Sequence, residues 1–191
     1  YLRMPAVATL VLAVGAGYLI GGIRSALVVA ALTLFIALSP WWDRALVTLY
    51  MATFGVVISC LIGFTVGTLC FQNKKSAAFM LGVCDIFQTF PSFVYLIPVM
   101  MLFGITDTSV LIAVIVYATI PATRYTIEGL RSVPVGLHEA ATMSGVNKFQ
   151  RLTKIEFPLA FPHMMLGLNQ TIVFALFMVI IGAFIGTEDL G

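Results

Sequence analysis

Long stretches without a single charged residue constrain the fold of this chain more than any other feature. Residues 45–73 and 157–187 form the two longest, and shorter ones cover residues 4–23, 25–42, 76–84, 86–106 and 108–123. A helix crosses the ~30 Å hydrocarbon core of a membrane with about 20 residues. Helices satisfy their own backbone hydrogen bonds, and these runs lack the alternation of barrel strands. The sequence therefore predicts an all-α, polytopic membrane protein.

Six spans fit these runs. We place them at Met4–Ile20, Ala26–Trp42, Leu46–Phe71, Phe79–Phe103, Ser109–Thr123 and Pro158–Ile185. The fifth is short and needs neighbouring helices or local thinning of the bilayer. Composition agrees, because 61% of the 191 residues are apolar and 9% are charged, against roughly 45–50% and about 25% in soluble domains. A soluble globular domain is excluded, and the net charge of +2 gives no reason to expect nucleic-acid binding.

The basic residues predict the orientation in the membrane. If the spans alternate, eight of the ten Lys and Arg fall on one side, namely Arg24, Lys74, Lys75, Arg124, Arg131, Lys148, Arg151 and Lys154. Positive charge marks the cytoplasmic side, so Arg3 and Arg44 lie outside. Trp41 and Trp42 are expected at the outer interface, where indole rings are favoured.

The connection between the last two spans differs from the others. Residues 124–156 hold eight of the eighteen charges, and the stretch is too apolar for a disordered tail. We expect a helix that starts at Pro134 and presents Leu137, Ala140, Ala141 and Ser144 on one face. Gly145 supplies a turn. A second helix fits Asn147–Ile155, capped by Asn147, with Phe149, Leu152 and Ile155 on one stripe, until Pro158 ends it.

Two interpretations of this connection are open from spacing alone. The small-residue face permits close approach of another protein. Alternatively, both helices lie on the lipid surface with Lys148, Arg151 and Lys154 facing anionic headgroups.

The same residues form a recognisable motif. Glu139, Ala140 and Ala141 are followed after three residues by Gly145, and after nine more by the run from Ile155 to Pro158. This spacing resembles the EAA signature of permease subunits in binding-protein-dependent ABC importers, with Phe157 where leucine is usual. Residues 85–98 (DIFQTFPSFVYLIP) and 167–171 (GLNQT) are similar to glycine betaine and proline betaine permeases. The resemblance covers about residues 45–191.

The resemblance implies a fold, partners and a mechanism. The fold is the type I ABC importer transmembrane fold, with residues 124–157 as the coupling loop. The partners are an ATP-binding cassette subunit that uses ATP and Mg, a periplasmic or lipid-anchored solute-binding protein, and a second copy in a homodimer within a prokaryotic inner membrane. In that family the EAA helix sits in a groove of the ATPase and transmits its closure to the spans. ATPase coupling is thereby assigned to Glu139, Ala140, Ala141, Gly145, Ile155 and Pro158.

The implied cargo is a compatible solute such as glycine betaine, choline or a related methylated amine. An amino acid or another osmolyte fits the same architecture, and a channel or a scaffold would be a different class of protein. The subgroup usually has a Gly-Gly-Leu-Gly turn near its end, whereas Gly186–Gly191 carries two acids here. We expect the chain to be part of a longer polypeptide, with a further span after Gly191. Residues 1–44 then form two extra helices, serving as scaffold, lipid contact or anchor for the binding protein.

Polar side chains inside the spans are candidates for the solute path. They gather around a proline in the fourth span and at one point of the sixth: Gln88, Thr89, Pro91, Tyr95, Asn169, Gln170 and Thr171. Pro91 and Pro98 predict a kink with carbonyls freed toward the interior. Interhelical hydrogen bonding is the alternative for each polar group. Asp85 is placed near the cytoplasmic boundary, as a helix-start or partner-contact acid.

Aromatic and small residues extend this picture. The rings of Phe87, Phe90, Phe93 and Tyr95 could face a quaternary cation, although Phe in a span also commonly faces lipid. Glycines in the third and sixth spans permit close packing, either within one copy or between two: Gly55, Gly63, Gly67, Gly182 and Gly186.

No catalytic machinery stands out in the sequence. Cys60, Cys70 and Cys84 lack the spacing of a metal site and are interpreted as small buried hydrophobes. A Gly-rich phosphate loop is missing, so ATP is expected to bind a partner. His138 and His163 cannot be placed in a Ser/His/Asp set, which leaves an intramembrane protease or acyltransferase as a poor alternative.

Overall fold

The computed structural model describes residues 6–185, and every regular element in them is a helix. In chain order these are α1 (Ala6–Ala37), α2 (Trp42–Phe71), α3 (Lys74–Thr89), α4 (Phe93–Phe103), α5 (Asp107–Arg131), α6 (Val135–Met143), α7 (Lys148–Arg151), the π-helix η1 (Leu152–Glu156) and α8 (Phe157–Phe184). The all-α prediction is confirmed. The described chain divides into two units between Thr48 and Leu49.

The first unit contains α1 and the start of α2. α1 is broken at Gly21 and Gly22, and Gly22 has φ +67°, a conformation that favours glycine. The resulting helices, Ala8–Leu19 and Gly21–Ala37, are each shorter than 18 residues. The two spans expected on either side of Arg24 are therefore wrong in their bounds. The first helix ends at the glycine pair, before Arg24, and Arg24 lies inside the second helix. The beginning of the first span and Arg3 lie outside the described residues.

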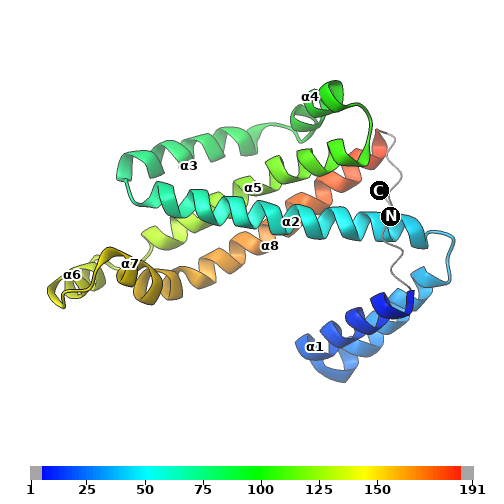
Figure 1. Ribbon diagram of the computed structural model, residues 1–191, viewed down its shortest axis with the longest axis horizontal. Helices are drawn as coiled ribbons and strands as arrows, with labels where there is room; N and C mark the ends of the chain where they lie inside the picture. The colour runs from blue at the N-terminus through cyan, green and yellow to red at the C-terminus, as the bar shows by residue number, and fades with distance from the viewer. Residues whose placement is uncertain (1–5, 186–191) are drawn as a thin grey trace. The chain divides into compact units, whose positions relative to one another are not determined.

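The second unit is built around α5 (Figure 1). Along α2, Gly55, Gly63 and Gly67 face Val114, Ala122 and Thr126 of α5 in the same order, so the two helices run parallel. Along α8, Gly167 faces Tyr125 of α5 and Gly182 faces Val110 of α5. The order is reversed, so α8 runs antiparallel to α5. Glycine at these positions lets the backbones approach closely. These glycines pack helices within one copy of the chain; Gly186 lies outside the described residues.

The predicted fourth span is two helices rather than one. α3 and α4 meet at an angle of 86° across residues 90–92. Pro91 has no N–H to continue α3, and Phe90 before it is extended, with φ −75° and ψ 138°. The predicted kink is confirmed, and its size makes this segment a broken span or a re-entrant pair.

The expectation of six single-helix spans is accordingly corrected. Within the described residues three helices are long and apolar enough to cross a membrane: Trp42–Phe71, Asp107–Arg131 and the continuous stretch Lys148–Phe184. The bent pair α3 and α4 adds a fourth if it counts as one span. α5 extends past the predicted end at Thr123 because Arg124 and Glu128 pair one helical turn apart, with Nε 3.0 Å from Oε1.

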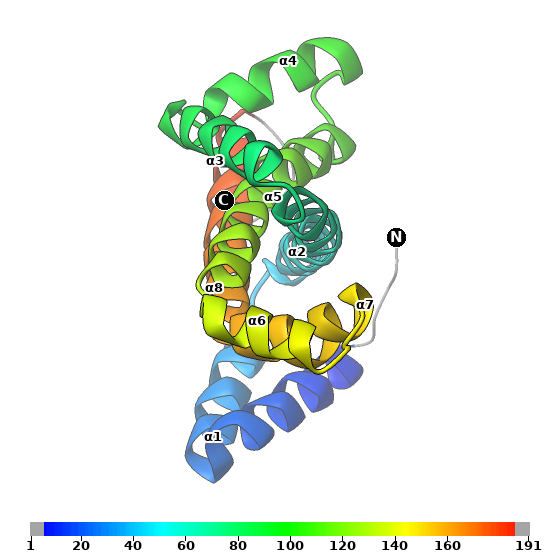
Figure 2. The same ribbon diagram turned by 90° about the vertical axis from the view of Figure 1, so that its left-hand side faces the viewer.

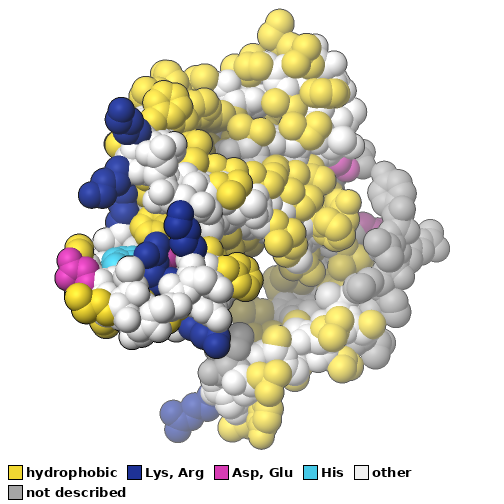
Figure 3. Space-filling view, turned by 60° about the vertical axis from the view of Figure 1, so that its left-hand side comes forward, with side chains coloured by type: hydrophobic (Ala, Val, Ile, Leu, Met, Phe, Trp, Pro, Cys, Tyr) yellow, Lys and Arg dark blue, Asp and Glu magenta, His cyan; other side chains and the backbone are white. Residues whose placement is uncertain are grey.

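One end of this unit carries the loop and most of its basic residues. Figures 1 and 2 show α6 and α7 at the same end as the start of α3, where Arg131 Nη2 donates to the carbonyl of Lys74 at 3.2 Å. Figure 3 shows Lys and Arg side chains gathered there. This arrangement agrees with the predicted grouping of Lys74, Lys75 and the basic residues from Arg131 to Lys154.

Candidate functional site

The loop between α5 and α8 has the helix-turn-helix form that the sequence predicts. Pro134 precedes α6, and Gly145 has φ +72° in the turn after it. Asn147 caps α7 in a capping box, since its side chain accepts from the N–H of Gln150 and its own N–H donates to Gln150 Oε1. The loop is shorter than the predicted 124–157, because residues 124–131 belong to α5.

The second loop helix does not end at Pro158. α7 continues through η1 into α8 without a break, giving one helical stretch over Lys148–Phe184. In the π turn the N–H of Phe157 donates to the carbonyl of Leu152, five residues back. The backbone hydrogen bonds here already join residues five positions apart instead of four. Pro158, which has no N–H, therefore does not interrupt a regular series of α-helical hydrogen bonds. The loop is therefore joined to α8 by a helix rather than by a flexible segment.

The EAA residues occupy different environments on the loop. Glu139 and Ala140 are exposed, Ala141 is buried and Ile155 is half-buried. A groove of about 490 Å³ separates α6 from the beginning of α8, and it is lined by residues that include Ala140, Ala141, Ser144, Ile155 and Pro158. Part of the predicted small-residue face is thus covered by the chain itself.

The outer face of α6, opposite the groove, is also open to a partner. Val135, Glu139 and Met143 follow one another at four-residue spacing, and all three are exposed. Met143 is 91% exposed and is the last residue of α6, the helix at the end of the second unit where Lys and Arg gather. Val135 is 69% exposed as well, so α6 presents two large apolar side chains, with Glu139 between them, that a partner could cover.

A buried carboxylate lies at the base of the loop. Glu156 is 2% exposed, and its Oε1 lies 3.1 Å from His138 Nδ1 and 2.9 Å from Arg151 Nε. Sequence reasoning gave neither Glu156 nor His138 a role. The sequence signal for a buried, paired acid at this position is that Glu156 stands between Ile155 and Phe157, at the edge of a long apolar run.

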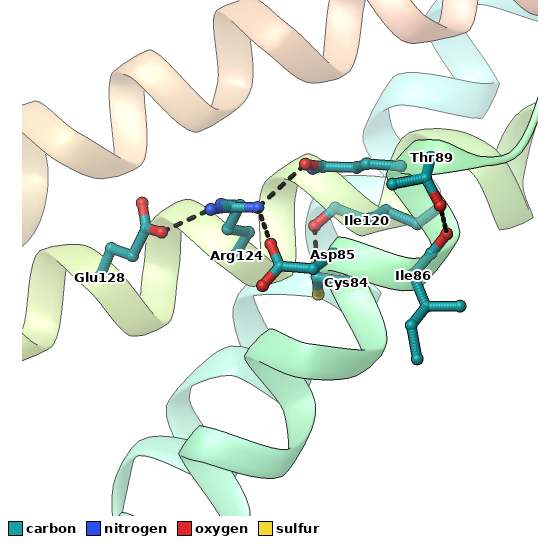
Figure 4. A network of polar contacts seen from close by, with 8 residues as sticks. Cys84, Asp85, Ile86, Thr89, Ile120, Arg124 and Glu128 are labelled. Carbon is teal, nitrogen blue, oxygen red and sulfur yellow. Dashed lines mark hydrogen bonds and ion pairs between the residues drawn. The ribbon is translucent and has the colours of Figure 1, made fainter.

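A second polar site lies between α3 and α5 (Figure 4). Arg124 donates through Nη1 to Asp85 and, at 3.0 Å, to Gln88 Oε1, and through Nε to Glu128 Oε1 at 3.0 Å. The side chains of Asp85, Arg124 and Glu128 are 60%, 30% and 38% exposed. We call Asp85, Gln88, Arg124 and Glu128 the Arg124 network. Its one guanidinium and two carboxylates leave an excess of negative charge.

The Arg124 network changes two predictions. Asp85 lies inside α3 and pairs with α5, so it is not a helix-start acid. Arg124 lies within α5 rather than in the loop. Its role escaped the sequence analysis because a charge was taken to end the span. The opposite charge of Glu128, four residues later, was the signal that the helix continues.

Tyr95 compensates for the missing N–H of Pro91. In an unbroken helix, residue 91 would donate to the carbonyl of Phe87; instead the Tyr95 hydroxyl donates to that carbonyl. Tyr95 is buried, and its ring lies 5.2 Å from that of Tyr117, which stacks on Phe174 at 4.7 Å. The three rings connect α4, α5 and α8. Phe90 and Phe93 are both exposed.

The remaining path candidates are more scattered. Thr89 is exposed and its hydroxyl donates to Ile86 in its own helix. Asn169 is exposed and Gln170 half-buried, whereas Thr171 is buried and donates to the carbonyl of Gly167. Among the hydrogen bonds of residues 6–185, none connects residues 169–171 with Gln88 or Tyr95. No cluster of three or more His, Cys, Asp and Glu in this range could hold a metal ion.

Comparison with known sequences identifies relatives along most of the chain. Residues 55–191 match the family described as binding-protein-dependent transport system inner membrane component. The whole chain is 90% identical to the trimethylamine N-oxide transport system permease protein TmoV of Pelagibacter ubique and 48% identical to that of Ruegeria pomeroyi. It spans only 27% and 29% of the lengths of these two proteins.

A more distant sequence and a solved structure agree with this result. Over 150 residues, which are 78% of this chain and 42% of the relative, it is 37% identical to the glycine betaine/proline betaine transport system permease protein ProW of Escherichia coli. An inward-facing structure of the MetNI methionine ABC transporter matches 75% of this chain and 73% of its own, with a TM-score of 0.65 and 22% identity. At that identity the likeness concerns the fold.

Proposed function

Because the chain belongs to the family of binding-protein-dependent transport system inner membrane components, we propose that it forms the membrane path and the ATPase-coupling loop of an ATP-driven importer for a methylated amine. The observation that carries the proposal is the exposed α6, which a short turn at Gly145 connects to the uninterrupted helical stretch Lys148–Phe184 that contains α8. A partner that displaces α6 would thereby act on a transmembrane helix.

The chemistry of the proposed cargo rests on relatives and on charge. Two relatives are named as trimethylamine N-oxide permeases and another as a glycine betaine/proline betaine permease. These solutes carry a positively charged methylated nitrogen. The excess negative charge of the Arg124 network and the rings of Tyr95 and Tyr117 support a path for such a group.

The proposed assembly has three further components. An ATP-binding cassette subunit would cover the exposed face of α6, where Glu139 offers a charge-assisted hydrogen bond. A solute-binding protein would deliver the cargo on the other side. A second copy of the chain would close the path at a two-fold axis, in the inner membrane of a prokaryote.

The test is transport by the complex of permease, ATPase and binding protein in vesicles. We expect uptake of labelled trimethylamine N-oxide that requires ATP, with glycine betaine and choline tested as competitors. Glu139→Arg should reduce uptake about tenfold or more, because it reverses the charge that faces the ATPase. Lys75→Gln, at the same end of the molecule, is the matched control.

Four outcomes would contradict the proposal or a part of it. Solute flux without ATP would indicate a channel, and no flux under any condition would indicate a scaffold. Unchanged ATP-driven uptake by Glu139→Arg would remove the assigned role of α6. Competition by an amino acid rather than by methylated amines would keep the importer but change its cargo.

A further inference from the structure

The buried carboxylate of Glu156 lies where the loop joins α8. It is among the largest fully buried side chains of the described residues, and it is the only acid in that group. One oxygen, Oε1, accepts from Arg151 Nε and lies within ion-pair distance of His138 Nδ1, at 3.1 Å. A buried carboxylate is costly unless it is paired, so both side chains are held in place by the same charge.

The π turn explains how Arg151 reaches Glu156. Residues five positions apart lie on different sides of an α-helix, which has 3.6 residues per turn. η1 has the wider i→i+5 pattern, with the N–H of Phe157 bonded to the carbonyl of Leu152. This widening brings Arg151 and Glu156 onto one side, where their side chains bond at 2.9 Å.

His138 is the partner from the other arm of the loop. It lies on α6 directly before Glu139 and is partly buried, whereas Glu156 immediately precedes α8. α6 makes only sparse backbone contact with the other described helices. The close contact between His138 Nδ1 and Glu156 Oε1 is therefore a direct polar link between α6 and the helical stretch that leads into α8.

We propose that Glu156 is a positioning residue that fixes α6 to the base of α8 through His138, so that displacement of α6 moves α8 with it. This inference rests on the proposed function, since it concerns how ATP hydrolysis by the partner reaches the membrane path. Without the link, α6 can follow the ATPase while α8 stays behind. ATP would then be consumed with little solute import.

The contact can be tested through the donor atom of His138. His138→Asn keeps an N–H near the position of Nδ1, whereas His138→Leu keeps bulk without a donor. Glu156→Gln keeps the shape and one acceptor oxygen but removes the charge. All variants are assembled with the ATPase and the binding protein in vesicles, and the number of ATP molecules hydrolysed per solute imported is measured, with Lys75→Gln as control.

We expect His138→Leu and Glu156→Gln to raise this ratio about tenfold, because losing one partner of a buried charged pair shifts an equilibrium by at least that factor. His138→Asn should stay within about twofold of the unaltered complex, since its donor remains. A merely structural role would lower the amount of assembled complex without changing the ratio. Complex yield and midpoint of thermal unfolding are therefore recorded for each variant.

The outcomes separate this inference from the proposed function. If the unaltered complex shows no ATP-driven import, the proposed function fails. If it imports normally and His138→Leu keeps its ratio, the inference is overturned while the importer stands. Equal uncoupling by His138→Asn and His138→Leu also overturns it, because the donor would then be irrelevant. If Glu156→Gln does not assemble, the pair of His138 variants still decides.

Discussion

At the scale of single residues, a proline and a tyrosine together build the bend between α3 and α4. Pro91 cannot donate to the carbonyl of Phe87, and the Tyr95 hydroxyl takes that place. Ser92, which lies in the bend, also donates through its hydroxyl to Tyr117 Oη of α5 at 3.4 Å. The sharp change of direction is thus held by side-chain hydroxyls together with backbone turns, in which the N–H groups of Val94 and Tyr95 donate to the carbonyls of Pro91 and Ser92.

Removal of the tyrosine hydroxyl tests this account. Tyr95→Phe should lower the free energy of unfolding by about 1–3 kcal/mol, because the Phe87 carbonyl loses its donor in an apolar setting. Unfolding of the detergent-solubilised protein by heat or denaturant measures the change. Tyr50→Phe, which alters an exposed ring packed on Phe54, is the control; equal effects of the two variants would contradict the role of the hydroxyl.

Some residues could be assigned from sequence because their role is local. The turn at Gly145 and the cap at Asn147 follow from the preferences of those residue types within three or four positions. Arg124 and Glu156 could not be assigned in this way. Their partners, Asp85 and His138, are 39 and 18 residues away, and a single sequence does not indicate such pairs.

At the scale of helices, small residues decide how closely α2 approaches α5. A Cβ atom at position 67 would lie 2.9 Å from the carbonyl oxygen of Thr123 and 2.7 Å from Cβ of Thr126. Ser59, in the same stripe, donates to the carbonyl of Ile115 at 3.1 Å. The interface therefore combines backbone proximity with one polar contact, as is common between membrane helices.

The glycines of α2 and α3 provide a matched pair of variants. Gly67→Ala should destabilise the protein by about 1–3 kcal/mol, because α2 and α5 must separate to admit the methyl group. At Gly82 of α3 the added Cβ meets nothing within 4 Å, so Gly82→Ala should raise stability by up to about 1 kcal/mol. Denaturant unfolding of both variants measures the difference, and a neutral Gly67→Ala would mean that the packing adjusts.

Helix type was predictable from the uncharged runs, whereas helix ends were not. The runs correctly indicate helices in the described parts of the expected spans, since a helix satisfies the polar backbone groups of an apolar segment within itself. Charges mark the ends poorly, because Arg124 and Glu128 pair on the surface of α5 and allow it to continue. Backbone effects of Gly22 and Pro91 break helices inside uncharged runs.

At the scale of the second unit, one face of α3 and α5 is too polar for lipid. Ionisable side chains in transmembrane segments face a protein interior or a water-filled cavity, since lipid solvates them poorly. Asp85 and Glu128 are both partly exposed on this chain alone. We therefore expect this face to border water or a second copy in the assembled protein, in contrast to the apolar outer side of α2.

Thiol labelling tests this assignment in intact membranes. Thr89 follows Asp85 by one helical turn, and Leu61 is an exposed apolar residue of α2. After replacement of Cys60, Cys70 and Cys84 by alanine, Thr89→Cys should react with a hydrophilic maleimide about tenfold faster than Leu61→Cys, because only the hydrated thiolate reacts. Similar rates would indicate that the polar face is not hydrated.

The unbroken helical stretch from Lys148 to Phe184 also sets the scale of any motion. Its 37 residues form a rod about 55 Å long at ~1.5 Å per residue. A tilt of about 5° at one end of such a rod moves the other end by roughly 5 Å, about the width of a small solute. Amplification of this kind needs no hinge within the membrane. The displacement on the far side would then depend on the length of the helical stretch as well as on the displacement at the loop.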